Sequence, residues 1–287
     1  MLLGPRGLGP SAQGLVMSSY IHGTSPEEQR RLSLMNDVLL NQAELRELNL
    51  RGDESIIDFG SGLGQFTRAM ARVVPRGHVV GIERDEKQLA GSRRLAKADS
   101  EEKLVEFRSG DVVELDLGER EWGTFDVAHA RFVLEHVTDP LRVVRNMVRA
   151  VRPEGRVVLA DDDHDVLRLW PEPPGFNELW RAYMRTYDRN GNDPYIGRRL
   201  VSLLHAAGAN PVRNTWIFFG GCAGMDVFET LAANMLGVVV TARDRIVGGD
   251  LLSEFAFDAA VHGYRTWAAR PDAAIWFSMC WAEGKRS

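Results

Sequence analysis

The chain is short of cysteine, has no long apolar run and carries no excess of basic residues. Cys222 and Cys280 are the only cysteines among 287 residues, and their spacing is neither that of a metal site nor that of a disulfide framework. This scarcity indicates a reducing compartment, so we expect a cytoplasmic protein. No apolar stretch reaches the roughly 18 residues that a membrane-spanning helix needs. The formal net charge of −5 argues against a nucleic-acid partner, because phosphate binding depends on clustered Lys and Arg.

The first 50 residues divide into two parts. Residues 1–17 are rich in glycine and small side chains and lack the apolar core of a signal peptide, which predicts a disordered lead-in. Residues 18–50 are expected to form N-terminal lid helices. A helix start is indicated by Ser25, which can cap the helix, by Pro26 in the first turn, and by Glu28, which completes a capping box.

From residue 51 onwards, short apolar strands alternate with helical patterns. Such alternation is typical of βαβ units and predicts an α/β fold with a mainly parallel sheet. Between residues 162 and 194 the chain is rich in Trp, Tyr, Phe and Pro, and no strand is expected there. The expected strands are residues 55–59, 78–82, 104–107, 125–130, 156–160, 212–219 and 274–281.

The same pattern separates a core from two insertions. Residues 51–161 are expected to form the ligand-binding core. Residues 162–195 would form a helical, aromatic insert that caps the substrate. Residues 196–287 would complete the sheet around a second helical insert at residues 225–269. Both inserts flank the C-terminal half of the sheet, so we expect them to cover the ligand face.

A glycine-rich turn follows the first expected strand. Residues 60–64 read Gly-Ser-Gly-Leu-Gly and come directly before a helical pattern. Glycines permit a tight turn and let backbone N–H groups approach a ligand at a helix start. A dinucleotide-binding loop would read G-x-G-x-x-G, but Gln65 stands where that pattern needs its third glycine. The turn alone is a weak signal.

Carboxylates stand near the ends of three successive strands. Asp58 precedes the glycine turn, Glu83 ends the second strand, and Asp111 follows the third strand after Gly110. Glu83 can accept hydrogen bonds from two ribose hydroxyls, and Asp111, beside the apolar Val112, can accept one from an adenine amine. Each acid alone is equally well explained as a surface charge. Together, at the edge where open α/β sheets bind ligands, they predict a site for a nucleoside-containing ligand.

These segments resemble the successive motifs of the class I S-adenosylmethionine (AdoMet)-dependent methyltransferases. The closer resemblance is to the ubiquinone and menaquinone biosynthesis type. It covers roughly residues 50–161 and implies a Rossmann-like, seven-stranded mixed sheet whose last strand is antiparallel, with helical cap inserts. Ser61 is a mild departure, because most relatives carry cysteine there. The segments that carry the resemblance are residues 58–64, 81–83, 109–111, 125–127, 134–137 and 141–155.

The resemblance also implies AdoMet as the cofactor and assigns residues to it. The glycine turn would lie at the methionine part, Glu83 at the ribose and Asp111 at the adenine. In small-molecule members an N-terminal Tyr or Arg closes over the cofactor carboxylate, which indicates Tyr20 and Arg31. The residues expected at the cofactor are Tyr20, Arg31, Asp58, Gly60, Ser61, Gly62, Gly64, Glu83, Arg84, Gly110, Asp111, Val112, Arg131 and Phe132.

Methyl transfer depends mainly on alignment, and the sequence shows no conspicuous catalytic cluster. His136 is the leading candidate base, because it follows the fourth strand and an unperturbed imidazole has a pKa of about 6.5; a structural role at a helix start is the alternative. Asp161, the first of three acids before His164, is a second candidate base or substrate anchor, and Tyr20 is a third catalytic candidate. No metal site is expected, because consecutive side chains point in different directions.

Aromatic residues of the first insert recur at helical spacing. Phe176, Trp180, Tyr183 and Tyr187 would share one face, either as core packing or as part of an apolar pocket. We therefore expect a methyltransferase that acts on O, C or N of an apolar, aromatic or polyketide-like small molecule, with a homodimer formed through the second insert as a further expectation. Two alternatives stay open: an NAD(P)-dependent oxidoreductase, and a catalytically silent AdoMet-binding scaffold or sensor.

Overall fold

The computed structural model describes residues 40–287 of the chain. The expectations for Tyr20, Arg31, the lead-in at residues 1–17 and most of the lid helices lie outside the described residues. The strands are β1 (Ser55–Phe59), β2 (His78–Glu83), β3 (Val105–Ser109), β4 (Phe125–Arg131), β5 (Val151–Asp162), β6 (Arg168–Trp170), β7 (Ala209–Cys222) and β8 (Ala274–Arg286).

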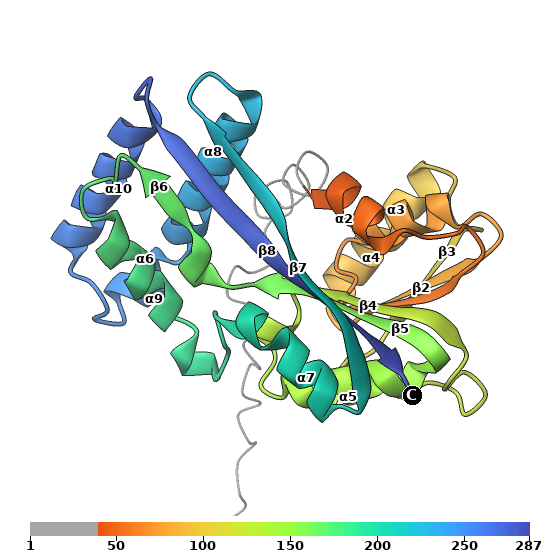
Figure 1. Ribbon diagram of the computed structural model, residues 1–287. Helices are drawn as coiled ribbons and strands as arrows, with labels where there is room; N and C mark the ends of the chain where they lie inside the picture. The colour runs from red at the N-terminus through yellow and green to blue at the C-terminus, as the bar shows by residue number, and fades with distance from the viewer. Residues whose placement is uncertain (1–39) are drawn as a thin grey trace, which may run out of the picture.

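Helices connect and cover these strands (Figure 1). The α-helices are α2 (Asn41–Leu48), α3 (Gln65–Val73), α4 (Glu86–Ala98), α5 (Pro140–Ala150), α6 (Phe176–Arg185), α7 (Leu200–Ala206), α8 (Asp226–Thr241), α9 (Arg243–Val247) and α10 (Glu254–Ala268). The short 3-10 helices are η2 (Leu134–His136), η3 (His164–Val166), η4 (Asp188–Asn190) and η5 (Ile196–Arg199).

The sheet has the order β3-β2-β1-β4-β5-β8, and β7 and β6 both pair with β8. Strands β1 to β5 are parallel to one another, whereas β8 is antiparallel to β5, β6 and β7. Strands β5 and β6 lie end to end along one side of β8, and β7 follows its other side (Figure 1). The predicted α/β fold with an antiparallel last strand is confirmed.

The structure corrects three details of the predicted strands. The insert expected to lack strands contains β6, whose three residues pair only with β8 and show no period of their own. The sheet therefore has eight strands, not seven. Strand β5 also begins at Val151, before the expected strand of residues 156–160; in this early part the register with β4 shifts between Phe125 and Val127, and Glu154 has a positive φ of 61°.

Local capping signals place two of the helices. The Asp85 side chain accepts hydrogen bonds from the backbone N–H groups of Lys87 and Gln88 at the start of α4. The Asp139 side chain accepts one from Arg142 N–H, with Pro140 in the first turn of α5. Both caps can be read from the sequence, because an N-cap is decided within four residues of chain.

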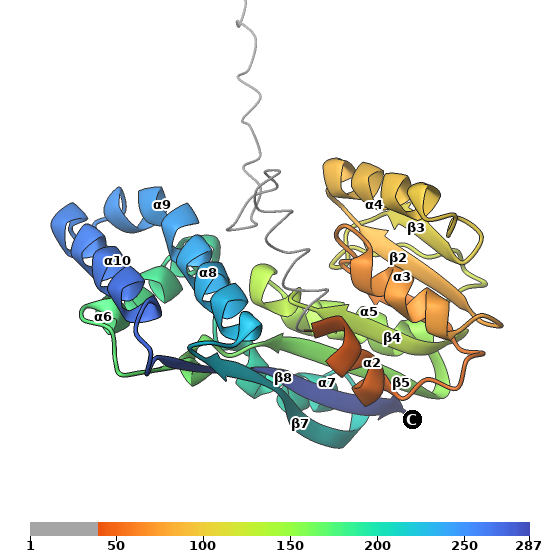
Figure 2. The same cartoon turned by 90° about the horizontal axis from the view of Figure 1, so that it is seen from above.

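Alternate residues of the central strands face two apolar layers. Ile56 of β1 belongs to the layer that also includes residues of α2, α3 and α4. Its neighbour Ile57 belongs to the layer formed with α5 and α7. Buried parallel strands need helices on both faces, and here the helices cover them in this way (Figure 2). The carboxyl ends of β1 to β5 therefore share one edge.

The helices of the two inserts pack together at the β6 end of the sheet, as α6, α8, α9 and α10 (Figure 2). The predicted aromatic face of α6 is buried there, with ring centroids 5.9 Å apart for Phe176 and Trp180 and 5.0 Å apart for Trp180 and Tyr183. This stripe is core packing. In contrast, Trp170, Trp216 and Phe218 of β6 and β7 are largely exposed.

Candidate functional site

The glycine turn between β1 and α3 has a backbone that only glycine adopts readily. Gly60, Gly62 and Gly64 have φ angles of 74°, 55° and 70°. The N–H groups of Gly60 and Ser61 both donate to the carbonyl of Ile82, at 2.9 Å, so the turn is held against the end of β2. The spacing of the glycines in the sequence thus reflects three left-handed positions in five residues.

Glu83 lies directly against this turn. Its Oε2 accepts from Gly62 N–H at 2.9 Å, and its Oε1 accepts from Asp85 N–H at 2.8 Å. Burial raises the pKa of the Glu83 carboxyl, against the lowering effect of these two N–H donors. Each carboxylate oxygen can accept a further hydrogen bond, so Glu83 retains the capacity to receive two hydroxyl donors.

Asp111 lies next along the same edge. Its Oδ1 accepts from Val113 N–H at 2.8 Å, and its Oδ2 lies 3.6 Å from Nη1 of Arg84. The backbone N–H of Gly110 donates to the carbonyl of Glu83 at 3.1 Å, which ties the end of β3 to the end of β2. The side chain of Asp111 is 42% exposed and can meet a ligand. The structure thus brings the predicted turn, Glu83 and Asp111 together at one edge.

Asp58 has a different position from the other two acids. It is buried, and its carboxylate accepts from Thr67 Oγ1 at 2.6 Å and lies 2.8 Å from His129 Nδ1. These contacts join β1 to α3 and β4. Asp58 therefore supports the turn from within the core, and its direct contact with a cofactor stays a prediction.

Arg131, at the end of β4, is paired with the N-terminal helix α2. Its Nη1 lies 2.9 Å from Oε1 of Glu44 and 3.1 Å from Oδ1 of Asn41, and its guanidinium stacks 4.6 Å above the ring of Phe66. Glu44 is fully buried, and burial raises its pKa although Arg131 opposes this. The role of Arg131 at the cofactor stays a prediction, but the structure shows it anchoring α2.

The next residue, Phe132, is strained. Its φ is 53°, in the left-handed region that a bulky side chain rarely adopts, and its N–H donates to the carbonyl of Ala160 at 3.0 Å. Such strain persists where surrounding contacts impose it and is concentrated at functional sites. This agrees with the expectation that Phe132 lies at a functional site, and its contact with the cofactor stays a prediction.

The glycine turn yields a stability prediction. Gly64→Ala would place a Cβ 2.3 Å from Cζ of Phe107 at a φ of 70°, so we expect a loss of about 2–4 kcal/mol in the free energy of unfolding. Gly208→Ala is the matched control, because Gly208 has a φ of 89° but no atom within 4 Å of the added Cβ. It should cost only about 1–2 kcal/mol. Urea denaturation of both variants measures the difference, and equal losses would contradict the packing argument.

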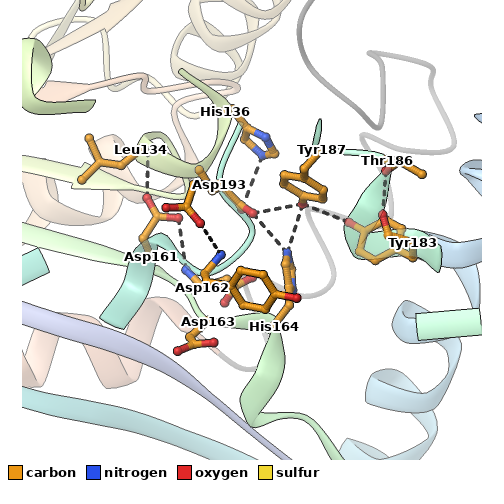
Figure 3. Close-up of polar contacts among 12 residues, drawn as sticks. Leu134, His136, Asp161, Asp162, Asp163, His164, Tyr183, Thr186, Tyr187 and Asp193 are labelled. Carbon is orange, nitrogen blue, oxygen red and sulfur yellow. Dashed lines mark hydrogen bonds and ion pairs between the residues drawn. The ribbon is translucent and has the colours of Figure 1, made fainter. Parts of the chain in front are cut away.

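A second polar cluster lies where β4 and β5 end (Figure 3). Oε2 of Glu135 accepts from the hydroxyl of Tyr187 at 3.0 Å and lies 3.1 Å from Nε2 of His164. The Tyr187 hydroxyl is also 3.1 Å from that of Tyr183. Glu135 is buried, and burial raises its pKa to about 8. The aromatic insert is thus hydrogen-bonded to the end of β4.

Asp161 organises the backbone beside this cluster. Its Oδ2 accepts from the N–H groups of Val133 and Leu134, at 3.2 and 2.8 Å, and its Oδ1 accepts from Asp162 N–H at 3.1 Å. Asp161 is completely buried, and this burial raises its pKa well above the ordinary range. Its carboxylate holds η2 in place, while its role as a base or anchor stays a prediction.

His136 is nearly buried at the end of η2. Its ring stacks on Tyr187 with centroids 6.0 Å apart, and its Nε2 lies 3.4 Å from Oε1 of Glu135. Burial lowers its pKa to about 3, with His164 and Arg84 contributing. The ordinary pKa near 6.5 that supported a base in the sequence does not hold in the folded chain, and His136 is neutral at pH 7.

The residue-by-residue predictions missed the partners that these networks depend on. His129 lies in the middle of β4 and Glu44 lies on α2. Tyr187 was expected to pack in the core or to line an apolar pocket, not to hydrogen-bond to an acid. Glu135 was part of a recognised segment but received no role. The only sequence signal for any of them is a polar residue within an apolar strand, which applies to His129.

Among residues 40–287, no helix is long and apolar enough to cross a membrane.

Comparison with known proteins agrees with this geometry. Residues 27–214 match a family described as methyltransferase domain. The chain is 34% identical over 167 residues to an uncharacterized 37.1 kDa transposon protein of Streptomyces fradiae, covering 57% of this chain and 46% of that protein. It is 28% identical over 176 residues to a demethylmenaquinone methyltransferase of Halalkalibacterium halodurans, covering 58% and 66%. The chain thus spans about half to two thirds of these relatives' length.

A solved structure shows the same fold. Geranyl diphosphate methyltransferase in complex with AdoMet superposes with a TM-score of 0.52 at 15% identity, covering 92% of each chain. The fold and the edge site define a class I, Rossmann-like AdoMet-binding protein. Because the family match spans more than half of its length, the chain belongs to the AdoMet-dependent methyltransferase family.

The described residues fit AdoMet. The hydroxyl of Ser61, inside the glycine turn, is buried and has no hydrogen-bond partner among residues 40–287. A Cβ at Gly60 would lie 2.5 Å from Val133, so the turn is already closed on its inner side. Glu83 and Asp111 lie further along the same edge, so the predicted contacts for the methionine, ribose and adenine parts follow one another in that order.

Proposed function

We propose that the protein transfers the methyl group of AdoMet to an oxygen, carbon or nitrogen atom of an apolar, aromatic or polyketide-like small molecule. The observation that carries this proposal is the juxtaposition of the left-handed glycine turn with Glu83 and Asp111 along one sheet edge. Family membership supports the reaction, and two similar proteins are named for small-molecule substrates, demethylmenaquinone and geranyl diphosphate.

The cofactor would supply a methyl group on a positively charged sulfur, and the protein's contribution is alignment and exclusion of water. The glycine turn and Glu83 would hold the donor, while Phe132 and η2 would border the acceptor. Asp161 keeps η2 in place through its bonds to Val133 and Leu134. No cationic side chain is needed to stabilise the reaction, because charge on the donor disappears as transfer proceeds.

The direct test is calorimetric titration with AdoMet and S-adenosylhomocysteine, followed by transfer of a labelled methyl group to a panel of phenols, quinols and amines. Binding with turnover supports the proposal. Absence of binding to either compound overturns it. Binding without turnover on any acceptor would support the scaffold or sensor alternative, and binding of NAD(P) instead would support the oxidoreductase, which family membership disfavours.

His136 provides a prediction on turnover. It lies on η2 in contact with Glu135 and Tyr187, and it makes no hydrogen bond to Glu83 or Asp111 among the contacts of residues 40–287. We expect His136→Ala to lower kcat at least tenfold while the AdoMet dissociation constant changes less than twofold. His205→Ala, which removes an exposed imidazole on α7, is the control. Full activity of His136→Ala, with its fold intact by circular dichroism, would leave His136 with a packing role only.

The predicted homodimer is retained as part of the proposal. Its expected interface is the second insert, on which Phe255 of α10 is 85% exposed and Val240 of α8 is 40% exposed. Sedimentation equilibrium at micromolar concentration tests it directly. A monomer at all concentrations would contradict this part without affecting the proposed reaction.

A further inference from the structure

Three potential metal ligands converge behind η2. Glu135 lies on η2, Asp162 at the end of β5 and His164 on η3, and Figure 3 shows Asp162 and His164 close together. One ligand atom of each residue lies within 4.8 Å of the others. The pair Glu135 and His164 is already close, with 3.1 Å between Oε2 and Nε2. The pairing of β4 with β5 brings the three groups together. No spacing of residues in the sequence predicts this grouping.

The polar atoms of this cluster are incompletely satisfied. Oδ1 of Asp162 and Nδ1 of His164 are buried and have no hydrogen-bond partner among residues 40–287. His164 is only 6% exposed. A buried polar atom without a partner costs about 1–3 kcal/mol, so two such atoms in residues of one cluster indicate a missing ligand.

The cluster is also rich in carboxyl groups that lack a cationic partner. Within the described part of the chain, no Lys or Arg forms an ion pair with Glu135, Asp161 or Asp162. Arg198 of η5 is bound instead to Asp163 by two contacts of 2.7 Å and to Asp165 by one of 3.1 Å. A bound cation would stabilise the ionised form of these carboxyl groups, so its binding would displace the protons that burial otherwise favours.

We propose that Glu135, Asp162 and His164 bind one divalent transition-metal ion, such as Mn²⁺ or Zn²⁺. One imidazole and two carboxylates suit these ions, which accept both nitrogen and oxygen donors, better than they suit Mg²⁺ or Ca²⁺, which prefer oxygen alone. Ligand bonds of about 2.0–2.2 Å require donor atoms roughly 3–4 Å apart, so the three groups must approach by several tenths of an ångström.

The surroundings are suited to hold such an ion. Tyr187 donates its hydroxyl to Oε2 of Glu135, which fixes that carboxylate, and Trp180 Nε1 donates to the carbonyl of His164 at 2.8 Å. Outer hydrogen bonds of this kind orient metal ligands. Three protein ligands leave at least one position open. If the proposed methyl transfer holds, that position would take an acceptor oxygen and lower the pKa of its hydroxyl, which favours O-methylation.

The test measures metal binding without any methyl acceptor. Protein stripped with a chelator is titrated with Mn²⁺ and, separately, with Zn²⁺, by calorimetry, and bound Mn²⁺ is counted by electron paramagnetic resonance. We expect one ion per chain. Asp162→Asn, the least buried of the three positions, should weaken binding at least tenfold. Asp165→Asn is the matched control, because it removes an exposed acid one residue beyond His164, and it should bind as the unmodified protein does.

Two results would overturn the inference. One is a chain that binds neither ion more tightly than millimolar. The other is an Asp162→Asn variant that is folded by circular dichroism and binds as tightly as the unmodified chain, since the ion would then lie elsewhere. AdoMet binding is measured on the same stripped protein. A chain that binds AdoMet but neither metal ion would refute this inference alone. A chain that binds a metal ion but not AdoMet would refute the proposed function alone.

Discussion

Replacing Glu83 with alanine should weaken AdoMet binding by about 1–3 kcal/mol, or roughly 5- to 150-fold, which calorimetry resolves readily. The physical reason is that this carboxylate can accept two charge-assisted hydrogen bonds from ribose hydroxyls. It also accepts from Gly62 N–H and Asp85 N–H, so its loss leaves the glycine turn without one of its anchors. The effect should appear in affinity for S-adenosylhomocysteine as well, because both ligands carry the same ribose.

The matched control is Glu86→Ala, three residues further along the same loop. Glu86 is exposed, and within residues 40–287 its carboxylate accepts a hydrogen bond from the hydroxyl of Ser109, at 2.9 Å. Its replacement should change affinity less than twofold. Glu83→Gln separates charge from shape, and we expect an intermediate loss. Unchanged affinity of a folded Glu83→Ala protein would remove the ribose role, and with it the main support for the proposed site.

Arg131→Met should lower the free energy of unfolding by about 3–5 kcal/mol, because it leaves the buried Glu44 carboxylate without its cation. Arg145→Met, on the exposed side of α5, is the control and should change stability by less than about 0.5 kcal/mol. The double variant Arg131→Met, Glu44→Gln should recover a large part of the loss, since the uncompensated charge is gone. Chemical denaturation at pH 7 measures all three.

The loss should also depend on pH. Burial raises the folded-state pKa of Glu44, and removing Arg131 takes away the group that most strongly opposes this. A carboxyl whose pKa is raised on folding contributes stability that is present below its unfolded pKa and is lost as pH rises through its folded pKa. The defect of Arg131→Met should therefore shrink as pH falls towards about 4.5 and be largest above neutrality. A defect that is the same at pH 5 and pH 8 would show that Glu44 is not the cause.

Both predictions concern residues that the sequence indicated, but for different reasons. Glu83 was recognised because its position after the second strand, and its distance from the glycine turn, are properties of a local βαβ unit. Arg131 was recognised only by resemblance, and its observed partner Glu44 lies 87 residues earlier in the chain. Nothing in the residues around Arg131 specifies that partner, because the contact depends on where α2 docks.

The cluster around Glu135 shows the same division. Its contact with Tyr187 spans 52 residues and exists only because the aromatic insert folds back over the end of β4. The helical spacing of that insert predicted a shared face correctly, since a period of 3.6 residues is a local property. It did not specify that Tyr187, the last member, would turn its hydroxyl towards a buried acid.

By itself, the sequence determined the alternation of strands and helices, the helix caps at Asp85 and Asp139, and the glycine turn with its two acids, because each is decided by a few neighbouring residues and by backbone stereochemistry. Only the tertiary structure decided the short strand β6, the burial of Asp58 beside His129, the lowered pKa of His136 and the grouping of Glu135 with Asp162 and His164. These follow from contacts between distant segments, where burial and electrostatics depend on the whole fold.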